Sequence, residues 1–418
     1  MPLTFSEYLV QLTESVTNED GPTLAYLLRP TSPHGKDLVK EFRNPTRKSL
    51  SYYEGGIESP WDEIAIQYVL VVHHVAKKRA GEAFKEHTQL VSLFFRFFTS
   101  NSGWTLPALF AILRDLRDLA FDVKYTVHVP PSCDADLQAN NNKSENMEEA
   151  ARIISKAFGN CVTDRSSPLA ESRKWGIYYV VGLVLKTYFR VKRISLAKPI
   201  LRALRANTDI PPLSAYPRSH QVTYRYYVGM LHFLDEDYAQ AEQELTLAFY
   251  NCHIEAHSNQ ERILTYLIPL RMLRGHLPSR ELMGRFPALD DLYAPFIRAI
   301  RRGDIKTYDE ALDKWERRLV ELNLYLNLEK ARELCIRGLF RRVWVVSQKG
   351  SRIPVSMFHS SLRLSGIEVP QEEAECLVAN MIYKGFMRGY ISHEKQMVVL
   401  AKTDAFPRLA DRPSPFAL

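Results

Sequence analysis

The chain has 418 residues, of which 46% are apolar and 25% are charged. This length and composition are those of a globular protein of two or three domains, and they exclude a mostly disordered chain, a collagen-like fibre and a small disulfide scaffold. The 55 Lys and Arg residues outnumber the 48 Asp and Glu residues, and the resulting net charge of +7 favours an anionic partner without identifying it.

Neither a secretory signal nor a membrane span is predicted. Residues 1–20 lack a basic segment followed by an apolar run. The most apolar stretch, residues 175–185, is shorter than the roughly 20 residues that a spanning helix needs. The five cysteines lie far apart and form no Cys-x-x-Cys pair, which is typical of a reducing compartment such as the cytosol or the nucleus.

Helical periodicity dominates the first three quarters of the chain. The predicted helices in the N-terminal part are residues 6–16, 22–28, 61–78, 81–98 and 106–124. Residues 130–146, with two consecutive prolines and three consecutive asparagines, are predicted to be a loop or linker. Helices resume at residues 148–158, 171–192 and 195–206, and prolines break the pattern again at 210–217.

Residues 221–252 predict a hairpin of two antiparallel helices, as in a tetratricopeptide repeat. Gly229 on the first helix faces small residues such as Ala241 and Ala248 on the second, and small side chains allow helices to approach closely. The acidic turn at 235–237 separates the two helices. A similar pattern at 303–319 and a weaker one at 195–204 predict an array of helical hairpins with irregular spacing.

Residues 324–401 have a different pattern. Three predicted helices at 324–347, 354–364 and 371–384, the second starting at a proline in the first helical position, precede two short strands at 387–392 and 396–401, which is the order of a winged helix. The predicted fold is therefore mainly α: a right-handed array of tetratricopeptide-like hairpins followed by a C-terminal winged helix with a small β-hairpin. The expected domains are N-terminal repeats (1–129), a linker (130–146), further repeats (147–322), the winged helix (323–405) and a tail (406–418).

No catalytic motif is present: the sequence lacks a phosphate-binding loop, a dinucleotide fingerprint, a nucleophile elbow and His-Glu-x-x-His. His253 and His257 can share one helix face beside Cys252, but no fourth metal ligand is suggested nearby, so packing or helix-end histidines are the preferred interpretation. An enzyme without a linear signature remains an alternative. We expect a binding protein with no catalytic residue, no metal and no cofactor.

The positive charge is concentrated in three segments. Residues 171–207 carry nine Lys or Arg and one acid, residues 262–302 carry eight Arg and three acids, and residues 323–405 carry twelve basic and eight acidic residues. In the winged helix the candidates for contact with nucleic-acid phosphates are Arg341, Arg342, Lys349, Arg352, Arg363, Lys384, Arg388 and Lys395. The alternatives are a winged helix that only mediates oligomerisation, and arginines that form solvated helix faces or internal salt bridges.

Five sequence stretches carry a resemblance to a known family: SRKWG at 172–176, KPILRA at 198–203, VTYRYYVG at 222–229, PLRMLRGH at 269–276 and GYISH at 389–393. These stretches, and the order of helical repeats followed by a winged helix, resemble the PCI-domain family. Its members include scaffold subunits of the proteasome lid, of the COP-nine signalosome and of translation initiation factor three. Within that family the chain is similar, over residues 61–407, to the branch of PCI-domain-containing protein two, whose fungal relatives are the PCI subunit of the transcription-and-export complex two and the twelfth signalosome-associated subunit.

The resemblance implies a non-enzymatic scaffold subunit of a nuclear complex that couples transcription to mRNA export or processing, located in the nucleus, at nuclear pores and also in the cytoplasm. Its implied partners are a larger PCI-domain scaffold protein, a small acidic disordered subunit shared with the proteasome lid, and RNA or DNA bound without sequence specificity, with no membrane insertion. The arginines that can face the acidic subunit are Arg262, Arg271, Arg274, Arg298, Arg301 and Arg302. Trp175, Tyr227 and Tyr390 are expected to pack. The alternative function is that of a signalosome-associated scaffold in cullin deneddylation.

Overall fold

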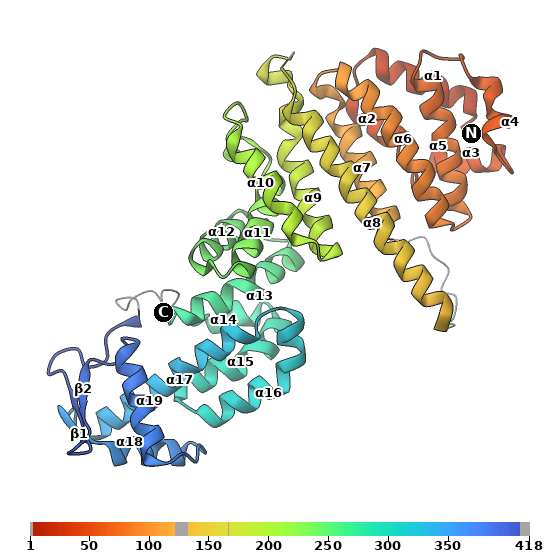
Figure 1. Cartoon of the computed structure of the whole chain (residues 1–418). Coiled ribbons are helices and arrows are strands. Elements are labelled where there is room, and N and C mark those ends of the chain that lie inside the picture. Colours follow the sequence, from red (N-terminus) through yellow and green to blue (C-terminus); the bar gives the residue numbers. More distant parts are fainter. Residues whose placement is uncertain (1–2, 122–132, 166, 410–418) are drawn as a thin grey trace. The chain divides into compact units, whose positions relative to one another are not determined.

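The computed structural model describes residues 3–121, 133–165 and 167–409, which form two compact units, residues 1–227 and residues 228–418. Nearly all regular structure in the described residues is helical, and a small three-stranded sheet lies in the second unit (Figure 1). The prediction of a mainly helical protein is confirmed. Within the described part of the chain, no helix combines the length and the apolar character needed to cross a membrane.

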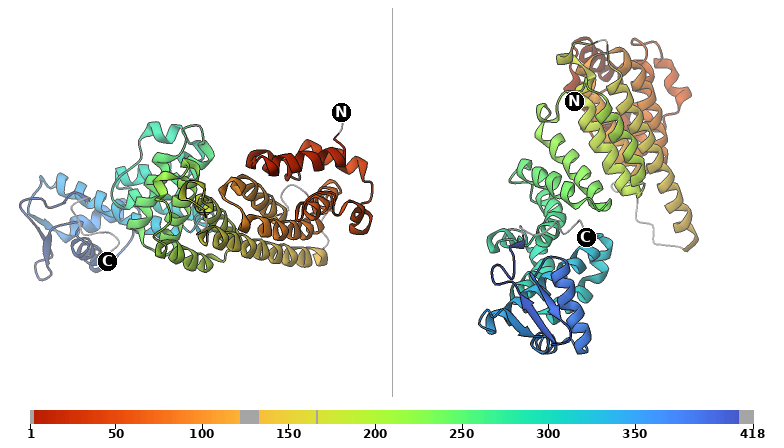
Figure 2. Two further views of the ribbon diagram at one scale, coloured as in Figure 1. Left: turned by 90° about the horizontal axis from the view of Figure 1, so that it is seen from above. Right: turned by 60° about the vertical axis from the view of Figure 1, so that its left-hand side comes forward.

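The first unit packs helices that are consecutive in the sequence against one another. Figure 2 shows α6, α7, α8 and α9 lying side by side, in agreement with their contacts. The helices of this unit are α1 (Phe5–Thr17), α2 (Gly21–Leu27), α3 (Pro33–Glu41), α4 (Arg47–Leu50), α5 (Trp61–Ala76), α6 (Ala80–Ser100), α7 (Leu106–Phe121), α8 (Cys133–Val162), α9 (Ile177–Val191) and α10 (Ala197–Ala206). Helix α11 (Arg218–Leu234) begins in the first unit and ends in the second.

A buried ion pair joins three segments of the first unit. Asp164, which follows α8, accepts hydrogen bonds from the Ser172 hydroxyl (2.8 Å) and from the Arg173 backbone N–H (2.9 Å). The Arg173 guanidinium lies 3.5 Å from the Asp164 carboxylate, and it also donates to the carbonyl oxygen of Phe98 at the end of α6 (3.1 Å). Both charged side chains are nearly inaccessible to solvent, so each depends on the other for its stabilisation.

The predicted loop at 130–146 is wrong for the residues that the structure describes. Helix α8 begins at Cys133 and continues to Val162, while residues 130–132 lie outside the described part. No proline or glycine occurs between Ser132 and Phe158, so nothing in the backbone stops a helix there, although asparagine is a poor helix former. The C-terminal half of α8 buries Ala150, Ile154 and Ala157 against its neighbours, and that packing outweighs the local preference of the asparagines.

The second unit contains the remaining elements. Its helices are α12 (Tyr238–Asn251), α13 (His257–Leu273), α14 (Arg280–Gly284), α15 (Pro287–Arg302), α16 (Ile305–Glu321), α17 (Tyr325–Val346), α18 (Val355–Leu364) and α19 (Gln371–Tyr383). The strands are β1 (Arg352–Pro354), β2 (Gly389–Ser392) and β3 (Met397–Leu400).

The helical hairpin predicted at 221–252 is formed by α11 and α12. Asp237 caps α12 by accepting a hydrogen bond from the Gln240 backbone N–H, as an acidic residue at this position commonly does. A Cβ atom at Gly229 would lie 2.9 Å from Leu245, so the close approach requires glycine. Gly303 has a similar role where α15 ends: its φ is +62°, and a Cβ there would lie 2.6 Å from the Leu339 nitrogen.

Several elements differ from the prediction. Leu169–Glu171 and Arg173–Gly176 form two short 3-10 turns, and α9 begins only at Ile177. Helices α13 and α15 are absent from the predicted elements. Each contains an internal proline, Pro269 and Pro295 respectively, a residue that usually interrupts a helix. Pro354 ends β1 and precedes α18, so it is the residue before the helix and not its first residue.

The winged helix contains one strand more than predicted. Strand β1 pairs with β3, and β3 pairs with β2, so the antiparallel sheet has the order β1-β3-β2. Ile353 and Val398 point from the sheet into the core, where Phe340 of α17 and Phe358 of α18 meet edge to face with ring centroids 5.1 Å apart. The sheet therefore has one face on the helices and one face toward solvent.

The segment after β3 folds back over the second unit. The Arg337 guanidinium donates to the Pro407 carbonyl oxygen (2.7 Å), and the Phe406 ring lies 5.5 Å from the Trp344 ring. Leu409 covers Gly275, which follows α13 and has a φ of +84°. Residues 405–409, which we call the C-terminal strap, thus connect the winged helix with the helical repeats of the same unit.

The buried ion pair leads to a prediction for Asp164→Asn. Burial raises the pKa of Asp164, but the hydrogen bonds from Ser172 and Arg173 and the Arg173 charge outweigh it, so the pKa lies well below its usual value. The substitution leaves Arg173 buried without a counter-charge and is expected to destabilise the first unit by about 3 kcal/mol. Guanidinium unfolding, followed by tryptophan fluorescence, measures this loss.

The pH dependence of the stability difference between the wild type and Asp164→Asn tests whether the effect comes from the charge of Asp164. Because the folded pKa of Asp164 is lowered, its contribution is complete above the unfolded pKa of about 3.9 and is lost as the pH falls toward the folded pKa. The difference between the wild type and Asp164→Asn should therefore shrink below about pH 4. Asp209→Asn, at an exposed position, should change the stability by less than about 0.5 kcal/mol. An equal effect of both variants would contradict the role of the pair.

Candidate nucleic-acid and partner interfaces

A long stretch of the winged helix contains no acidic residue. Residues 334–367, which include the end of α17, β1 and α18, carry six cations: Arg337, Arg341, Arg342, Lys349, Arg352 and Arg363. Arg337 is half-buried and holds the C-terminal strap, whereas the other five are exposed. Such a run of exposed cations gives a locally positive surface, which attracts a polyanion.

The backbone after α17 brings four predicted cations to the same end of that helix. Gln348 and Lys349 both have a positive φ, 54° and 57°, and the Lys349 N–H donates to the Trp344 carbonyl oxygen (2.9 Å). This reversal places Lys349 and Arg352 at the end of α17, whose last turns carry Arg341 and Arg342. Arg342 also donates to the Arg301 carbonyl oxygen (3.3 Å), so its guanidinium is partly engaged.

The other predicted phosphate contacts differ in their availability. Lys384 forms an ion pair with Glu333 of α17, and Arg388 forms one with Asp404 at 2.7 Å. Arg363 in the last turn of α18 and Lys395 in the turn between β2 and β3 are exposed, and no ion pair holds them within the described residues. Lys384 and Arg388 are thus each paired with a carboxylate of the same chain, whereas the other six of the eight candidates form no ion pair within the described residues.

The register of the sheet reveals a candidate that the sequence reasoning missed. Arg352 on β1 and Tyr390 on β2 are both paired with Val399 on β3, so the three residues form one row across the sheet. Residues in one row project from the same face, and this row projects to solvent because the neighbouring row with Val398 is buried. The Tyr390 side chain is 62% exposed, so the expectation that it packs is wrong.

The other two aromatic residues of the family-like stretches do pack. The Trp175 indole donates to the Leu169 carbonyl oxygen (2.7 Å), and its ring lies 5.2 Å from the Tyr216 ring. The Tyr227 ring lies 5.2 Å from the Phe189 ring. Side chains alternate between the two faces of β2, and this alternation places Tyr390 on the exposed face. The sequence alone cannot identify that face, because the buried row of the sheet must be known first.

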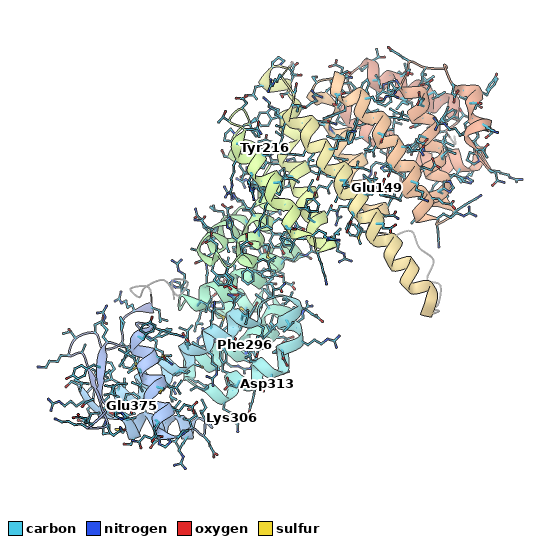
Figure 3. The ribbon with its side chains drawn as sticks, in the orientation of Figure 1. Glu149, Tyr216, Phe296, Lys306, Asp313 and Glu375 are labelled. Atoms are coloured by element: carbon cyan, nitrogen blue, oxygen red, sulfur yellow. The ribbon has the colours of Figure 1, made fainter. Side chains whose placement is uncertain are left out.

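Helix α19 begins with negative charge. Glu372 and Glu373 lie in its first turn, and Glu375 (labelled in Figure 3) follows two residues after Glu373. The second helix of a helix-turn-helix pair usually inserts its N-terminal residues into the major groove of DNA. An acidic N-terminus would repel the phosphates on either side of the groove, so the exposed sheet face and the end of α17 are the better candidates for contact.

Glu375 also connects α19 to the turn between β2 and β3. Its carboxylate contacts Nδ1 of His393 at 2.9 Å, and the Gln396 side chain joins Gln371 (2.9 Å). The hydrogen bond and the charge of Glu375 raise the pKa of His393 above its usual value. The turn that carries Lys395 is therefore joined to α19 by an ion pair whose strength depends on the protonation of His393.

The six arginines predicted to face an acidic partner do not form one surface. Arg271 and Arg274 pair with Glu242 of α12, at 3.6 and 2.8 Å, so they join α12 to the end of α13. Arg262 and Arg302 are exposed. Arg298 and Arg301 on α15 are the two arginines of this set that line one hollow together with further cations.

Arg298 and Arg301 line a surface hollow of about 620 Å³ beside α14 and α16. Arg280 and Lys314 also line it, and Asp290 and Asp291 are the acidic residues of its wall. The Arg301 guanidinium donates to the Pro278 carbonyl oxygen (3.4 Å). With four cations and two acids, this hollow suits an anionic segment of a partner.

The possible metal pattern at 252–257 has ordinary structural roles. Nδ1 of His253 accepts a hydrogen bond from the Glu255 backbone N–H (3.2 Å). Burial raises the pKa of the Cys252 thiol, which disfavours the thiolate that a metal requires. Within residues 3–121, 133–165 and 167–409, no three His, Cys, Asp or Glu side chains are arranged to hold a metal ion.

Comparison with known proteins gives one consistent result. Residues 312–402 match the PCI domain, a range that contains α17, α18, α19 and the sheet. The chain is 36% identical to the protein CSN12 homolog of Schizosaccharomyces pombe, over 97% of this chain and 98% of that protein. It is 38% identical to the CSN12 homolog of Neurospora crassa, over 78% and 77%, and 29% identical to PCI domain-containing protein 2 of Danio rerio, over 98% of both.

The contact between His393 and Glu375 leads to a prediction. Because the folded pKa of His393 is raised, the ion pair is complete below the unfolded pKa of about 6.5 and is lost as the pH rises through the folded value. In Glu375→Gln the pKa of His393 should fall to about 6.5, as measured by NMR titration of the histidine ring. His220, whose pKa is lowered by burial in the first unit, is the internal reference that should not change. A His393 pKa that is equal in both proteins would contradict the pairing.

Proposed function

The chain belongs to the PCI-domain family, in the group of the CSN12 homologues and PCI domain-containing protein 2, and we propose that it is a non-enzymatic scaffold subunit of a nuclear complex that couples transcription to mRNA export or processing. In this proposal it binds a second, larger PCI subunit, a small acidic disordered subunit and nucleic acid. The observation that carries the proposal is the set of five exposed cations in the acid-free stretch of the winged helix at 334–367.

The proposed nucleic-acid surface consists of the end of α17 and the exposed face of the sheet. Arg341, Lys349 and Arg352 supply positive charge, and cations of this kind bind phosphates without reading the sequence. Tyr390, in one row with Arg352, offers a ring on which an unpaired base can stack. A combination of cations and an exposed aromatic ring favours single-stranded RNA or DNA over a duplex.

The proposed contact with the larger PCI subunit lies beside this surface. Val345 and Val346 at the end of α17 are 47% and 75% exposed, and Met357 on α18 is 37% exposed. The Ser347 hydroxyl contacts the Met357 sulfur at 3.6 Å, so the two helices contribute to one apolar strip. Exposed apolar side chains that lie next to one another mark a site of protein association.

The proposed contact with the small acidic subunit is the hollow at α15. Arg298 and Arg301 line it together with Arg280 and Lys314. Arginine pairs with carboxylates through two parallel hydrogen bonds, which suits a disordered acidic segment that becomes ordered on binding. Arg271 and Arg274 are left out of this surface because both are paired with Glu242.

The nucleic-acid proposal is tested with Arg341→Glu plus Arg352→Glu. Fluorescence anisotropy with a labelled single-stranded RNA of about 20 nucleotides should show an affinity loss of tenfold or more, because two phosphate contacts become repulsive. The slope of log K against log salt should fall by about 0.7 for each lost phosphate contact. The matched control is Arg317→Glu plus Arg318→Glu on α16, which changes the net charge equally at exposed positions. Unchanged RNA affinity of the first variant would refute the proposed surface.

Tyr390→Ala separates base stacking from phosphate contact. It should weaken single-stranded RNA binding by about 1–3 kcal/mol and leave duplex binding nearly unchanged, because stacking requires an unpaired base. Tyr383→Ala is the control, since Tyr383 is 76% exposed but lies on α19 and not on the sheet face. An equal effect of the two variants would remove Tyr390 from the proposed surface.

The partners are tested by affinity purification of the chain from its own cells, followed by mass spectrometry. A larger PCI protein and a small acidic protein should be recovered together. Arg298→Glu plus Arg301→Glu should lose the small protein and retain the larger one, whereas Arg202→Glu plus Arg205→Glu, at exposed positions of α10, should retain both. Recovery of signalosome subunits in their place would favour a scaffold role in cullin deneddylation.

A further inference from the structure

The proposed function leaves the most positive segment of the chain unused. Residues 172–208 contain nine Lys or Arg and no acidic residue. In this segment α9 ends at Val191, a short 3-10 turn follows at Ile194–Leu196, and α10 begins at Ala197. The turn contains a serine, Ser195, that is exposed and whose hydroxyl makes no hydrogen bond within the described residues.

The surroundings of Ser195 fit the substrate preference of basic-directed protein kinases. Lys192 and Arg193 precede it by three and two residues, and Leu196 follows it directly. Kinases choose substrates by the charge pattern around the acceptor, and cations at these positions match an acidic substrate cleft. The Leu196 side chain is 50% exposed, so it can enter the apolar site that such kinases provide for the next residue.

A second serine shows why exposure of the flanking residues matters. Ser49 is also preceded by two basic residues, Arg47 and Lys48, and followed by a leucine. Leu50, however, is fully buried, and the Ser49 hydroxyl is engaged in a capping box with Thr46. Ser49 therefore has a similar local sequence but lacks the accessibility of Ser195.

A pocket beside Ser195 contains two arginines and one carboxylate. It has a volume of about 430 Å³, and its lining includes Arg152 and Glu148 of α8 together with Arg193, Ser195 and Leu196. Arg193 is paired with Glu148 at 3.3 Å, and this pair is partly exposed, so a stronger anion can displace the carboxylate.

We propose that Ser195 is a phosphorylation site for a basic-directed protein kinase and that the phosphate is held in this pocket by Arg152 and Arg193. In the reaction the Ser195 oxygen forms a bond to the γ-phosphorus of ATP. The bond between that phosphorus and the β,γ-bridging oxygen breaks, and its electron pair leaves with ADP. The serine proton goes to the catalytic base of the kinase.

The modification would change both the local structure and the surface charge. A phosphoserine carries a charge of about −1.5 to −2 and forms one to three strong hydrogen bonds when it lies opposite arginines or at a helix N-terminus. Bound to Arg152, it would link the turn before α10 to α8. It would also lower the positive charge of residues 172–208, so any polyanion bound there would be released. This inference concerns the first unit and goes beyond the proposed function.

The first experiment incubates the full chain with ATP and the catalytic subunit of cyclic-AMP-dependent protein kinase, a basic-directed kinase. Tandem mass spectrometry should find phosphate on Ser195 and not on Ser49. The phosphate should be absent in Ser195→Ala and at least tenfold reduced in Arg193→Ala. Failure to modify Ser195 in the folded chain, while a peptide of residues 190–200 is modified, would overturn the proposal because the fold would then block the site.

The second experiment measures the pocket itself by ³¹P NMR titration of the phosphorylated chain. Nearby cations favour the dianion, so the second pKa of phosphoserine 195 should lie about 0.5 to 1 below its value of about 6 in a short peptide. Phosphorylated Arg152→Ala should lose most of this shift, because Arg152 is one of the two cations that hold the phosphate. Glu148→Gln, which removes the competing carboxylate, should lower it further. If the phosphate has the same second pKa in the folded chain as in the peptide, the proposal that this pocket holds it is overturned.

Discussion

The first unit depends on the burial of opposite charges at Asp164 and Arg173. Three segments that are separate in the sequence meet there: the end of α6 through the Phe98 carbonyl, the residue group after α8, and the turns that begin α9. Both side chains are nearly inaccessible to solvent, and the Arg173 side chain that belongs to the turn Arg173–Gly176 before α9 is held by this pair. In the family-like stretch SRKWG, Ser172, Arg173 and Trp175 thus all make contacts inside the chain.

Local sequence predicts the helical hairpins because their determinants are local. Gly229 and Asp237 specify a close approach and a helix start within one short stretch, and both are found. The asparagine-rich stretch gave a wrong result because the helix there is stabilised by packing of residues further along α8. Helices α13 and α15, which are absent from the predicted elements, contain Pro269 and Pro295, and they tolerate an internal proline because neighbouring elements bury them. Strand β1 is short and pairs with a strand distant in sequence, so no local pattern marks it.

The candidate site shows a similar division. Counting charges found the basic winged helix, but it could not show which cations are already paired inside the chain, as Lys384 is with Glu333 and Arg388 is with Asp404. Tyr390 became a candidate only through the register that places it in one row with Arg352. The net charge of a segment can be counted from the sequence. Which cations are unpaired, and which side chains lie in one row of the sheet, depends on contacts between residues that are distant in the sequence.

The C-terminal strap has a consequence for the order of folding. The helical hairpins join residues that are near in sequence, so they can form early and with little loss of chain entropy. Leu409 and Gly275, in contrast, come from distant parts of the chain, as do Pro407 and Arg337. These contacts are made only after the helices and the sheet on which they lie exist. We therefore expect the C-terminal strap to form last when the second unit folds. Before that step, the winged helix would be folded but would not yet be joined to the helical repeats by the strap.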